Sequence, residues 1–548
     1  MKRILGAAIG NCVHVGGVIH FLQLAENEGY EANFLGPAVE IEKVIEAVKE
    51  YNPDIVGVSY RLTPENAEIL VNRLIELVKE NHLENRKWVF GGTKPVADVA
   101  KKMEFFDFIS DGTDDIDDSV MFLRGKHAVK GEELYADNIV ERINSKYPYP
   151  LLRHHYGRPS YEETLAGVRE ISEAKVLDII SLGPDQNTQQ YFFRPDEMLD
   201  EYSGAGGVPI RSAEEFKKLK DASKYGNYPL MRCYSGTQDV FDFAEVLHET
   251  INNAWCAVPL CWYNELDGRG TRKIEESIAE AQKLMKWHAE RHITVEVNEP
   301  HHWALRDAPD VMSVIMAYIS AYNAKKMGVS DYIAQYMFNV PNTLSFQMDL
   351  ARVLAMRDLV ESLKDEDFNV YRQTRAGLPF LCADFDVAKG QLASSTYLQM
   401  CVEPHIIHVV GFCEADHAAS AKEVIESCKI VRGVIRSTLQ GNVSYLNDTS
   451  VLERRNELIS EAKLTLEMIC KEYEEFEDPL ANPAVLADCV KRGIIDAPHI
   501  MKNERFVGDI STKIHNGKCI AFSKSQNRYL NEADRVTGII ERTKKLQL

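Results

Sequence analysis

The first stretch that could do chemistry is the loop of residues 10–17, Gly-Asn-Cys-Val-His-Val-Gly-Gly, which places one imidazole, His14, among small residues. The apolar run 4–9 before the loop predicts a buried strand, and residues 18–29 after it predict a helix. The loop therefore lies at the carboxyl end of a first strand, which is where open α/β sheets bind their ligands. Because glycines bound the loop, a large flat ligand could approach its backbone closely.

Two further loops follow predicted strands in the same part of the chain. Residues 54–59 predict a strand that ends at Ser59, and residues 88–90 predict another that ends at Gly91-Gly92. Together the three loops resemble the B12-binding domain of cobalamin enzymes, which carries an Asp-x-His-x-x-Gly loop, a serine loop and a Gly-Gly pair in this order. The resemblance implies that His14 is the lower axial ligand of the cobalt. It implies these cobalamin-binding residues: Cys12, His14, Gly16, Gly17, Ser59, Leu62, Gly91 and Gly92.

The sequence departs from that pattern at one position, because Cys12 stands where the family has an aspartate. A metal-bound imidazole usually has an acceptor at its other ring nitrogen, which fixes its tautomer. A thiol is a weak acceptor, so Asn11 or a backbone carbonyl would have to take this role. From the residues alone, a flavodoxin-like domain that binds a nucleotide or no ligand, with His14 as an ordinary loop residue, stays open.

Length, charge and cysteine content narrow the class of protein. A chain of 548 residues is too long for one domain and predicts two or three. Its net charge of −20 argues against a nucleic-acid partner, which needs a basic face. No apolar run is long enough to span a bilayer, and Met1-Lys2-Arg3 leads directly into the first strand, so we expect a cytoplasmic protein without membrane contact. The 11 cysteines lack metal-site spacing, so we expect buried, reduced thiols and no zinc–thiolate cluster.

The chain divides into a predicted amino-terminal domain, a linker and a larger carboxyl-terminal domain. Residues 1–125 alternate strands and helices and predict a flavodoxin-like, doubly wound α/β domain. Residues 126–175 are polar and irregular, and Pro148 and Pro150 exclude a helix over residues 147–152, so we interpret this stretch as a linker. Residues 176–548 alternate strand and helix seven or eight times at barrel-like length. This alternation predicts a (β/α)8 TIM barrel with a carboxyl-terminal extension.

Polar clusters follow the predicted barrel strands. In a TIM barrel the chemistry gathers at the carboxyl ends of the strands, so we expect most of these clusters to face a ligand. Arg232 is suited to hold a small acid, since a guanidinium can bind both oxygens of a carboxylate at once. The candidate ligand-facing residues at these strand ends are Asp185, Gln186, Asn187, Arg232, Tyr263, Glu299, His301, Arg372, Arg375 and Glu414.

The predicted barrel resembles the large catalytic subunit of glutamate mutase (methylaspartate mutase), and residues 1–125 resemble the small cobalamin subunit of that enzyme. The similarity is clearest over residues 207–305 and rests on the order of short features: Arg232-Cys233-Tyr234-Ser235-Gly236, then Tyr263-Asn264, then Asn298-Glu299-Pro300. The resemblance implies that Arg232 grips a substrate carboxylate. It also implies that Tyr263 and Glu299 contact the substrate and take part in catalysis.

Departures from that family change the expected substrate. Residues 183–187 and 204–207 lack the arginines that the family brings to its substrate, so glutamate is not expected. Arg372 and Arg375 could supply a different anion clamp, and Glu414 could replace the carboxylate that holds the adenosyl ribose in the family. The other candidates for substrate contact are Asp185, Gln186, Asn187 and His301.

We therefore expect an adenosylcobalamin-dependent mutase that rearranges the carbon skeleton of a small carboxylic acid or amino acid by radical chemistry, in which the cofactor carries the difficult step. The family likeness also implies a homodimer. A corrinoid-dependent methyltransferase is the first alternative, and it would need a thiol or pterin site. A non-catalytic corrinoid-binding protein is the second. A metal hydrolase at His301-His302 is disfavoured, because adjacent histidines lack the i, i+4 spacing of a helical metal site.

Overall fold

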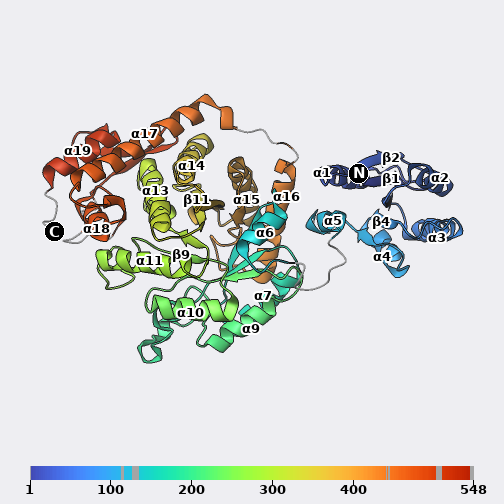
Figure 1. Cartoon of the computed structure of the whole chain (residues 1–548), viewed down its shortest axis with the longest axis horizontal. Helices are drawn as coiled ribbons and strands as arrows, with labels where there is room; N and C mark the ends of the chain where they lie inside the picture. The colour runs from blue at the N-terminus through green and yellow to red at the C-terminus, as the bar shows by residue number, and fades with distance from the viewer. Residues whose placement is uncertain are drawn as a thin grey trace. The chain divides into compact units, whose positions relative to one another are not determined.

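The computed structural model describes residues 2–112, 116–125, 135–439, 441, 445–500, 506 and 509–543. Its contacts divide the chain into two compact units, residues 1–134 and 135–548 (Figure 1). The first unit contains the predicted amino-terminal domain. The second contains the predicted barrel and also most of the predicted linker.

The first unit is built on a five-stranded parallel sheet with the strand order β2-β1-β3-β4-β5. This is the order of a flavodoxin-like doubly wound fold, as the sequence predicts. The strands are β1 (Arg3–Ala8), β2 (Glu31–Phe34), β3 (Ile55–Tyr60), β4 (Lys87–Gly92) and β5 (Phe108–Ser110). The helices are α1 (Gly16–Asn27), α2 (Ile41–Tyr51), α3 (Pro64–Glu80), α4 (Lys94–Lys102) and α5 (Ile116–Leu123).

Helices cover both faces of this sheet, which is why its strands are apolar on both sides. Val44 of α2, Val71 of α3 and Val96 of α4 belong to the core on one face. On the other face, α1 contributes Leu22, and α5, which contacts α1, contributes Phe122.

The second unit contains eight parallel strands in the order β8-β7-β6-β13-β12-β11-β10-β9, which confirms the predicted TIM-like barrel. Neighbours around the ring are hydrogen-bonded, and among the described residues only the seam between β8 and β9 lacks a ladder. The strands are β6 (Leu151–Tyr156), β7 (Ile179–Leu182), β8 (Leu230–Arg232), β9 (Cys256–Val258), β10 (Val295–Val297), β11 (Asp331–Phe338), β12 (Asn369–Ala376) and β13 (Ile406–His408).

The helices that precede, separate and follow these strands lie around the barrel, with the first of them at the amino ends of the strands (Figure 1). They are α6 (Ile139–Lys146), α7 (Tyr161–Glu173), α8 (Gln186–Tyr191), α9 (Ala213–Ser223), α10 (Val240–Ile251), α11 (Ile274–Ala289), α12 (Glu299–Ala304), α13 (Asp310–Lys326), α14 (Phe346–Glu361), α15 (Phe385–Gln399) and α16 (Ala421–Leu439).

The first barrel strand, β6, lies in the stretch that the sequence analysis interprets as a linker. Its sequence, Leu-Leu-Arg-His-His-Tyr, is buried along its whole length except at His155, which is half-buried. A strand with three basic-type residues in its middle does not show the apolar pattern of a buried strand. Pairing with β7 and β13 nevertheless places it inside the ring. The barrel therefore begins about 25 residues earlier than the predicted boundary at residue 176.

The barrel interior is layered. Its floor, at the amino ends of the strands, is an apolar cluster that includes Leu151, Ile179, Leu230, Trp255, Ile333 and Ile406. Two residues further along β6, β8, β11 and β13 stand Arg153, Arg232, Gln335 and His408, all of them buried. Since side chains alternate along a strand, residues two apart face the same side. A polar layer thus rests directly on an apolar floor.

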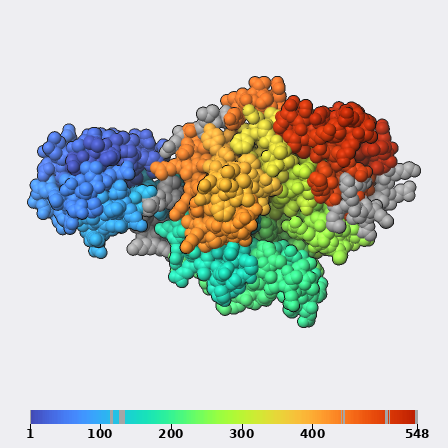
Figure 2. All heavy atoms as spheres, turned by 180° about the vertical axis from the view of Figure 1, so that it is seen from behind, coloured from blue at the N-terminus to red at the C-terminus, as the bar shows by residue number. Residues whose placement is uncertain are grey.

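A carboxyl-terminal extension packs against the helical layer on one side of the barrel. It consists of α17 (Thr449–Glu472), α18 (Pro483–Arg492), α19 (Glu532–Arg542) and a small antiparallel sheet of β14 (Thr512–His515), β15 (Lys518–Ser523) and β16 (Arg528–Tyr529). α17 contacts α13 and α14, and α18 contacts α11. Figure 2 shows these last residues, in red, lying directly against the yellow and green helices.

Across the described part of the chain, no helix combines the length and apolar content that crossing a bilayer requires. All 11 cysteines lie among the described residues, and each is free. All of them except Cys382 and Cys470 are buried, in agreement with the expected buried thiols.

Candidate functional site

The loop that follows β1 lies at the topological switch point of the first sheet. β2 and β3 pair with opposite edges of β1. The connections that follow adjacent strands therefore run in opposite directions, which opens a crevice at the strand ends. The loop is fixed at its base, because Gly10 N–H donates to the Val39 carbonyl (2.9 Å) and Cys12 N–H donates to the Ile9 carbonyl (3.2 Å). Gly10 adopts a φ of +65°, which favours glycine at this turn.

His14 is exposed on this loop, whereas Cys12 is fully buried. Cys12 Sγ lies 3.9 Å from His14 Nδ1, so the thiol occupies the place at which an aspartate would contact the ring. Asn11 is engaged elsewhere, since its Oδ1 accepts a hydrogen bond of 3.1 Å from the Tyr60 hydroxyl. The contact at Nδ1 leaves Nε2 as the nitrogen of His14 that can bind a metal.

Ser59 contributes an unpaired hydroxyl to the same end of the sheet. It pairs in register with Ala8 of β1 and Gly91 of β4, is only 5% exposed, and its Oγ has no hydrogen-bond partner within the described structure. A side chain at Gly91 would meet the Cβ of Ser59 at 3.8 Å, so the glycine leaves space beside the hydroxyl. Around Gly16 and Gly17 the space that a side chain would enter is open.

These features fit a corrinoid. A flat macrocycle needs a surface free of side chains, and a buried hydroxyl without a partner needs a polar group from a ligand. Leu62, which is 39% exposed, and Val13, which is 63% exposed, add apolar surface next to the loops. His14 Nε2, the Ser59 hydroxyl and the open surface at Gly16 and Gly17 would be available to such a ligand.

In the second unit, the polar layer of the barrel carries an excess of positive charge. Arg153 and Arg232 share one carboxylate, with Arg153 Nη1 3.8 Å and Arg232 Nη2 3.5 Å from Oε2 of Glu296. Trp255 Nε1 donates to the same oxygen at 2.6 Å. Burial, reinforced by the neighbouring Arg232 charge, lowers the pKa of Arg153 to about 9.

Of these side chains, Arg232 makes the fewest hydrogen bonds. The residue is 0% exposed, yet none of its three guanidinium nitrogens has a hydrogen-bond partner among the described residues. Its planar group lies against aromatic rings, 4.9 Å from the Tyr234 centroid and 5.1 Å from the Trp255 centroid. Oε1 of Glu296 is also unpaired. Burying a guanidinium without hydrogen bonds lowers the stability of the fold unless an anion supplies acceptor oxygens.

Arg153, by contrast, is fully hydrogen-bonded and begins a network across the barrel. It donates to Ser181 Oγ (2.7 Å), Gln373 Oε1 (2.9 Å) and His155 Nε2 (2.8 Å). Gln373 in turn donates to Gln335 Oε1 at 3.0 Å. The network positions side chains from several strands, so it can hold a ligand in one orientation.

The two ends of this network are imidazoles in the neutral form. Gln335 Nε2 lies 2.8 Å from His301 Nδ1, and the Tyr234 hydroxyl lies 2.8 Å from His155 Nε2. Burial, together with the nearby arginines, lowers the pKa of His155 and His301 well below the usual value. The same causes act on His408, whose Nδ1 has no hydrogen-bond partner among the described residues. The barrel interior therefore holds its positive charge on arginines, not on histidines.

Three further predicted residues border the polar layer. Burial lowers the pKa of Arg375, and the nearby Tyr234, Glu414 and Glu296 oppose this shift, which shows that Arg375 faces the same interior. Glu414 Oε1 accepts a hydrogen bond of 2.7 Å from Gly411 N–H and lies 3.1 Å from His154 Nε2. Tyr263 lies edge-on to His302, with ring centroids 5.9 Å apart, and burial raises its pKa to about 12.

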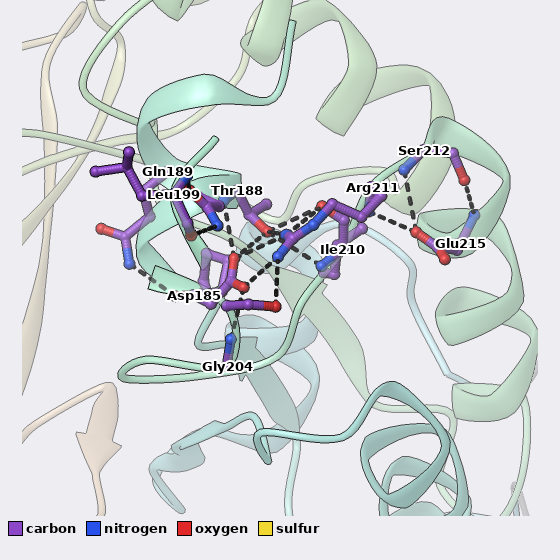
Figure 3. Close-up of polar contacts among 12 residues, drawn as sticks. Asp185, Thr188, Gln189, Leu199, Gly204, Ile210, Arg211, Ser212 and Glu215 are labelled. Carbon is purple, nitrogen blue, oxygen red and sulfur yellow. Dashed lines mark hydrogen bonds and ion pairs between the residues drawn. The ribbon is translucent and has the colours of Figure 1, made fainter. Parts of the chain in front are cut away.

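The predicted residues after β7 hold the chain in place instead of presenting free groups (Figure 3). The buried Asp185 accepts hydrogen bonds from Thr188 N–H (2.8 Å), Gly204 N–H (2.9 Å) and Arg211 Nη1 (2.9 Å). Asn187 bonds to the backbone of Leu199 in both directions, at 2.7 and 3.0 Å. Gln186 is exposed at the start of α8, so these three residues are not grouped with Arg232.

Glu299 and Arg372 are likewise engaged with the protein. The Glu299 carboxylate accepts from the N–H groups of Leu260 and Cys261 (2.7 Å each) and from Trp303 Nε1 (3.0 Å). Arg372 donates to the Glu403 carbonyl (3.0 Å) and to Glu361 Oε1 of α14 (2.9 Å). Because neighbours on a strand alternate, Arg372 faces the helical layer while Gln373 and Arg375 face the interior. The two arginines therefore do not form one clamp.

Several residues of this site carry no signal that the sequence analysis used. They are Arg153, His155, Glu296, Gln335, Gln373 and His408. Each stands inside a barrel strand, whereas the sequence predicts site residues at the strand ends. β6 shows no alternation of polar and apolar residues, because Arg153, His154 and His155 follow one another.

Comparisons with known proteins bear on the first unit. Residues 2–117 match the family model described as "B12 binding domain". Among solved structures, a cobalamin-binding protein from Desulfitobacterium hafniense DCB-2 is 26% identical, with 22% of this chain and 56% of that chain covered and a TM-score of 0.20. A cobalamin-dependent S-adenosylmethionine radical enzyme, OxsB, is 12% identical, with 86% of this chain and 61% of that chain covered and a TM-score of 0.17.

The chain thus spans less than two thirds of the length of either of these structures. No curated protein sequence matches it. Both the strand order and the family model that matches residues 2–117 identify the first unit as a B12-binding domain.

Proposed function

We propose that the chain is a cobalamin-dependent enzyme that rearranges the carbon skeleton of a small carboxylic acid. The B12-binding domain would hold the cofactor, and the barrel interior would hold the acid. The observation that carries this proposal is the fully buried Arg232, whose three nitrogens lack hydrogen-bond partners among the described residues.

Arg232 is suited to a carboxylate for geometric and electrostatic reasons. A guanidinium offers parallel N–H donors that match the two carboxylate oxygens, and in a dry interior such a pair is strong. The surplus charge supports the same choice of ligand, because two arginines share the single carboxylate of Glu296. An anion beside Arg232 would both complete its hydrogen bonds and balance this charge.

The residues around Arg232 would position the substrate and exclude water. The apolar floor closes the interior below the polar layer, and the network from His301 through Arg153 to Tyr234 fixes the side chains above it. When bound, adenosylcobalamin supplies radical chemistry, for which a protein needs precise positioning and a dry cavity more than an acid–base pair. The uncharged histidines of the interior agree with such a role.

Reconstitution tests the proposal. The full chain is purified without oxygen, loaded with adenosylcobalamin, and mixed with a panel of small di-acids and amino acids. We expect the visible spectrum of bound corrinoid and, with at least one acid, a paramagnetic signal that methylcobalamin does not give. A chain that retains no corrinoid, or that gives no signal with any acid, would refute the proposal.

A further inference from the structure

A second group of ligand-type side chains lies outside the site described above, on the loop after β13 and the start of α16. Cys413, His417 and Glu423 bring a thiol sulfur, an imidazole nitrogen and a carboxylate oxygen within 4.8 Å of one another. Cys413 is buried, Glu423 is half-buried and His417 is exposed. The loop follows the carboxyl end of a barrel strand, which is the end where TIM barrels assemble their active sites.

The orientation of His417 is set by a carboxylate on one side. His417 Nδ1 lies 2.8 Å from Oδ2 of Asp416, and its Nε2 lies 2.9 Å from Oε1 of Glu423. With the Nδ1 proton donated to Asp416, Nε2 presents a lone pair to an oxygen that also carries lone pairs. Two acceptors this close need a cation between them, which is either a proton or a metal ion. A carboxylate behind a histidine is also the usual arrangement around metal-bound imidazoles.

Glu423 is held in place independently of His417. Its other oxygen, Oε2, accepts hydrogen bonds from Ser420 N–H and Ser420 Oγ, at 2.8 Å each, at the start of α16. This capping interaction leaves Oε1 directed at His417 and Cys413. The imidazole of His417 and the carboxylate of Glu423 are thus oriented by contacts that do not require a ligand.

We propose that Cys413, His417 and Glu423 bind a divalent transition-metal ion of the zinc type and leave its fourth position open. Sulfur, imidazole nitrogen and carboxylate oxygen together are a donor set that zinc accepts, and three protein ligands with one open position are typical of catalytic zinc sites. The open position would take an oxygen or sulfur atom of a small molecule. This site goes beyond the proposed function, and neither depends on the other.

Cobalt(II) is a suitable probe because a cobalt–thiolate bond absorbs strongly in the near ultraviolet. Burial, and then the nearby Glu423 and Glu414, raise the pKa of the Cys413 thiol to about 12, so without a metal this thiol keeps its proton at neutral pH. The full chain, free of corrinoid and treated with a chelator, is titrated with Co²⁺. We expect a charge-transfer band and tetrahedral d–d bands that saturate at one equivalent and disappear when Zn²⁺ is added.

Matched variants assign the bands. Cys413→Ala should remove the charge-transfer band, whereas Cys428→Ala, at another buried cysteine of the same region, should keep it. His417→Ala changes an exposed side chain, so the fold should persist while the affinity for Co²⁺ falls at least about tenfold. Asp416→Asn should weaken binding less than His417→Ala.

The absence of a charge-transfer band at any Co²⁺ concentration would overturn the proposal and leave His417 as an imidazolium between two carboxylates. A band that survives Cys413→Ala would overturn it as well. Because the readout needs neither corrinoid nor substrate, its failure would not be confused with failure of the proposed function.

Discussion

Arg232 and Glu296 lie side by side in the barrel interior, with Nη2 and Oε2 3.5 Å apart, yet no described residue accepts a hydrogen bond from the guanidinium. Arg153 and Trp255 compete for the same carboxylate oxygen. The single carboxylate of Glu296 is therefore the shared countercharge of two buried guanidinium groups, those of Arg153 and Arg232. This imbalance makes the interior a place where an anion would bind and where the loss of a charge would be costly.

Replacing Glu296 by glutamine should destabilise the barrel, because it leaves two buried guanidinium groups without a countercharge. We expect the free energy of unfolding to fall by about 3 kcal/mol, as when one partner of a buried ion pair is removed. A small dicarboxylate such as succinate should restore part of this loss by binding at Arg232. Urea unfolding at pH 7.5, with and without the acid, measures both effects. A variant as stable as the parent would contradict the shared-charge interpretation.

Arg232→Lys should abolish the stabilisation that a bound acid gives to the parent chain, because lysine keeps the charge but loses the paired donors. The measurement is the shift of the thermal midpoint with increasing acid concentration. Arg492→Lys is the matched control, since Arg492 is also a buried arginine but is saturated by Glu472, Tyr473 and Thr543. It should lower the midpoint without removing the acid-dependent shift. Equal acid-dependent shifts in parent and Arg232→Lys would exclude Arg232 as the anion site.

His14 should ligate cobalt in spite of the cysteine beside it. In chain labelled with ¹⁵N-histidine and loaded with cobalamin, the electron paramagnetic resonance lines of Co(II) should show the two-line splitting of a ¹⁵N ligand. His14→Gln should remove this splitting, and His82→Asn, at an exposed histidine of the same unit, should not. A three-line pattern from unlabelled cofactor nitrogen in the parent would show that the cofactor keeps its own base.

Acid should destabilise the barrel at a pH where most carboxylates are still ionised. Burial lowers the pKa of His288 to about 4 and that of His155, His301, His302 and His408 well below the usual value near 6.5. Below about pH 6.5 these histidines are therefore protonated in the unfolded chain but stay neutral in the folded chain. Stability rises with pH wherever the unfolded state binds more protons, so these five histidines lower it as pH decreases from about 6.5.

Urea unfolding between pH 7.5 and 5.5 measures this slope. Each such histidine adds about 1.4 kcal/mol per pH unit once the unfolded form is fully protonated. His288→Leu should reduce the slope by about one proton, because its imidazole only donates to the Leu284 carbonyl of the same helix. A flat profile over this range would show that the histidines are protonated in the folded chain.

The sequence predicts the first unit well because its signals are local. Glycines mark the turns at strand ends, and alternating strand and helix patterns fix the doubly wound order. Ser59 and Gly91 are far apart in the chain. Their proximity can nevertheless be predicted, because the strands of one parallel sheet end at the same edge. What the sequence did not contain is that Cys12 contacts His14 while Asn11 is occupied by Tyr60.

The barrel shows the opposite case. Seven of its strands are apolar enough to be expected, but β6 carries Arg153, His154 and His155 and therefore has the polarity of a linker. Such residues are tolerated in a buried strand only because Ser181 and Gln373 from other strands, and Tyr234 from the loop after β8, satisfy them. Asp185 and Glu299 stand at strand ends as predicted, yet local backbone groups occupy their carboxylates.

The sequence by itself determined the two-part architecture and the B12-binding domain, and it singled out Arg232 as the candidate for an anion site. Only the tertiary structure decided which polar residues meet around Arg232 and which ones merely hold loops. The pattern of residue types along the chain indicates which positions are apolar and whether they repeat with the period of a helix or of a strand. Whether a buried polar group has a partner depends on atoms that other strands bring from far away in the sequence.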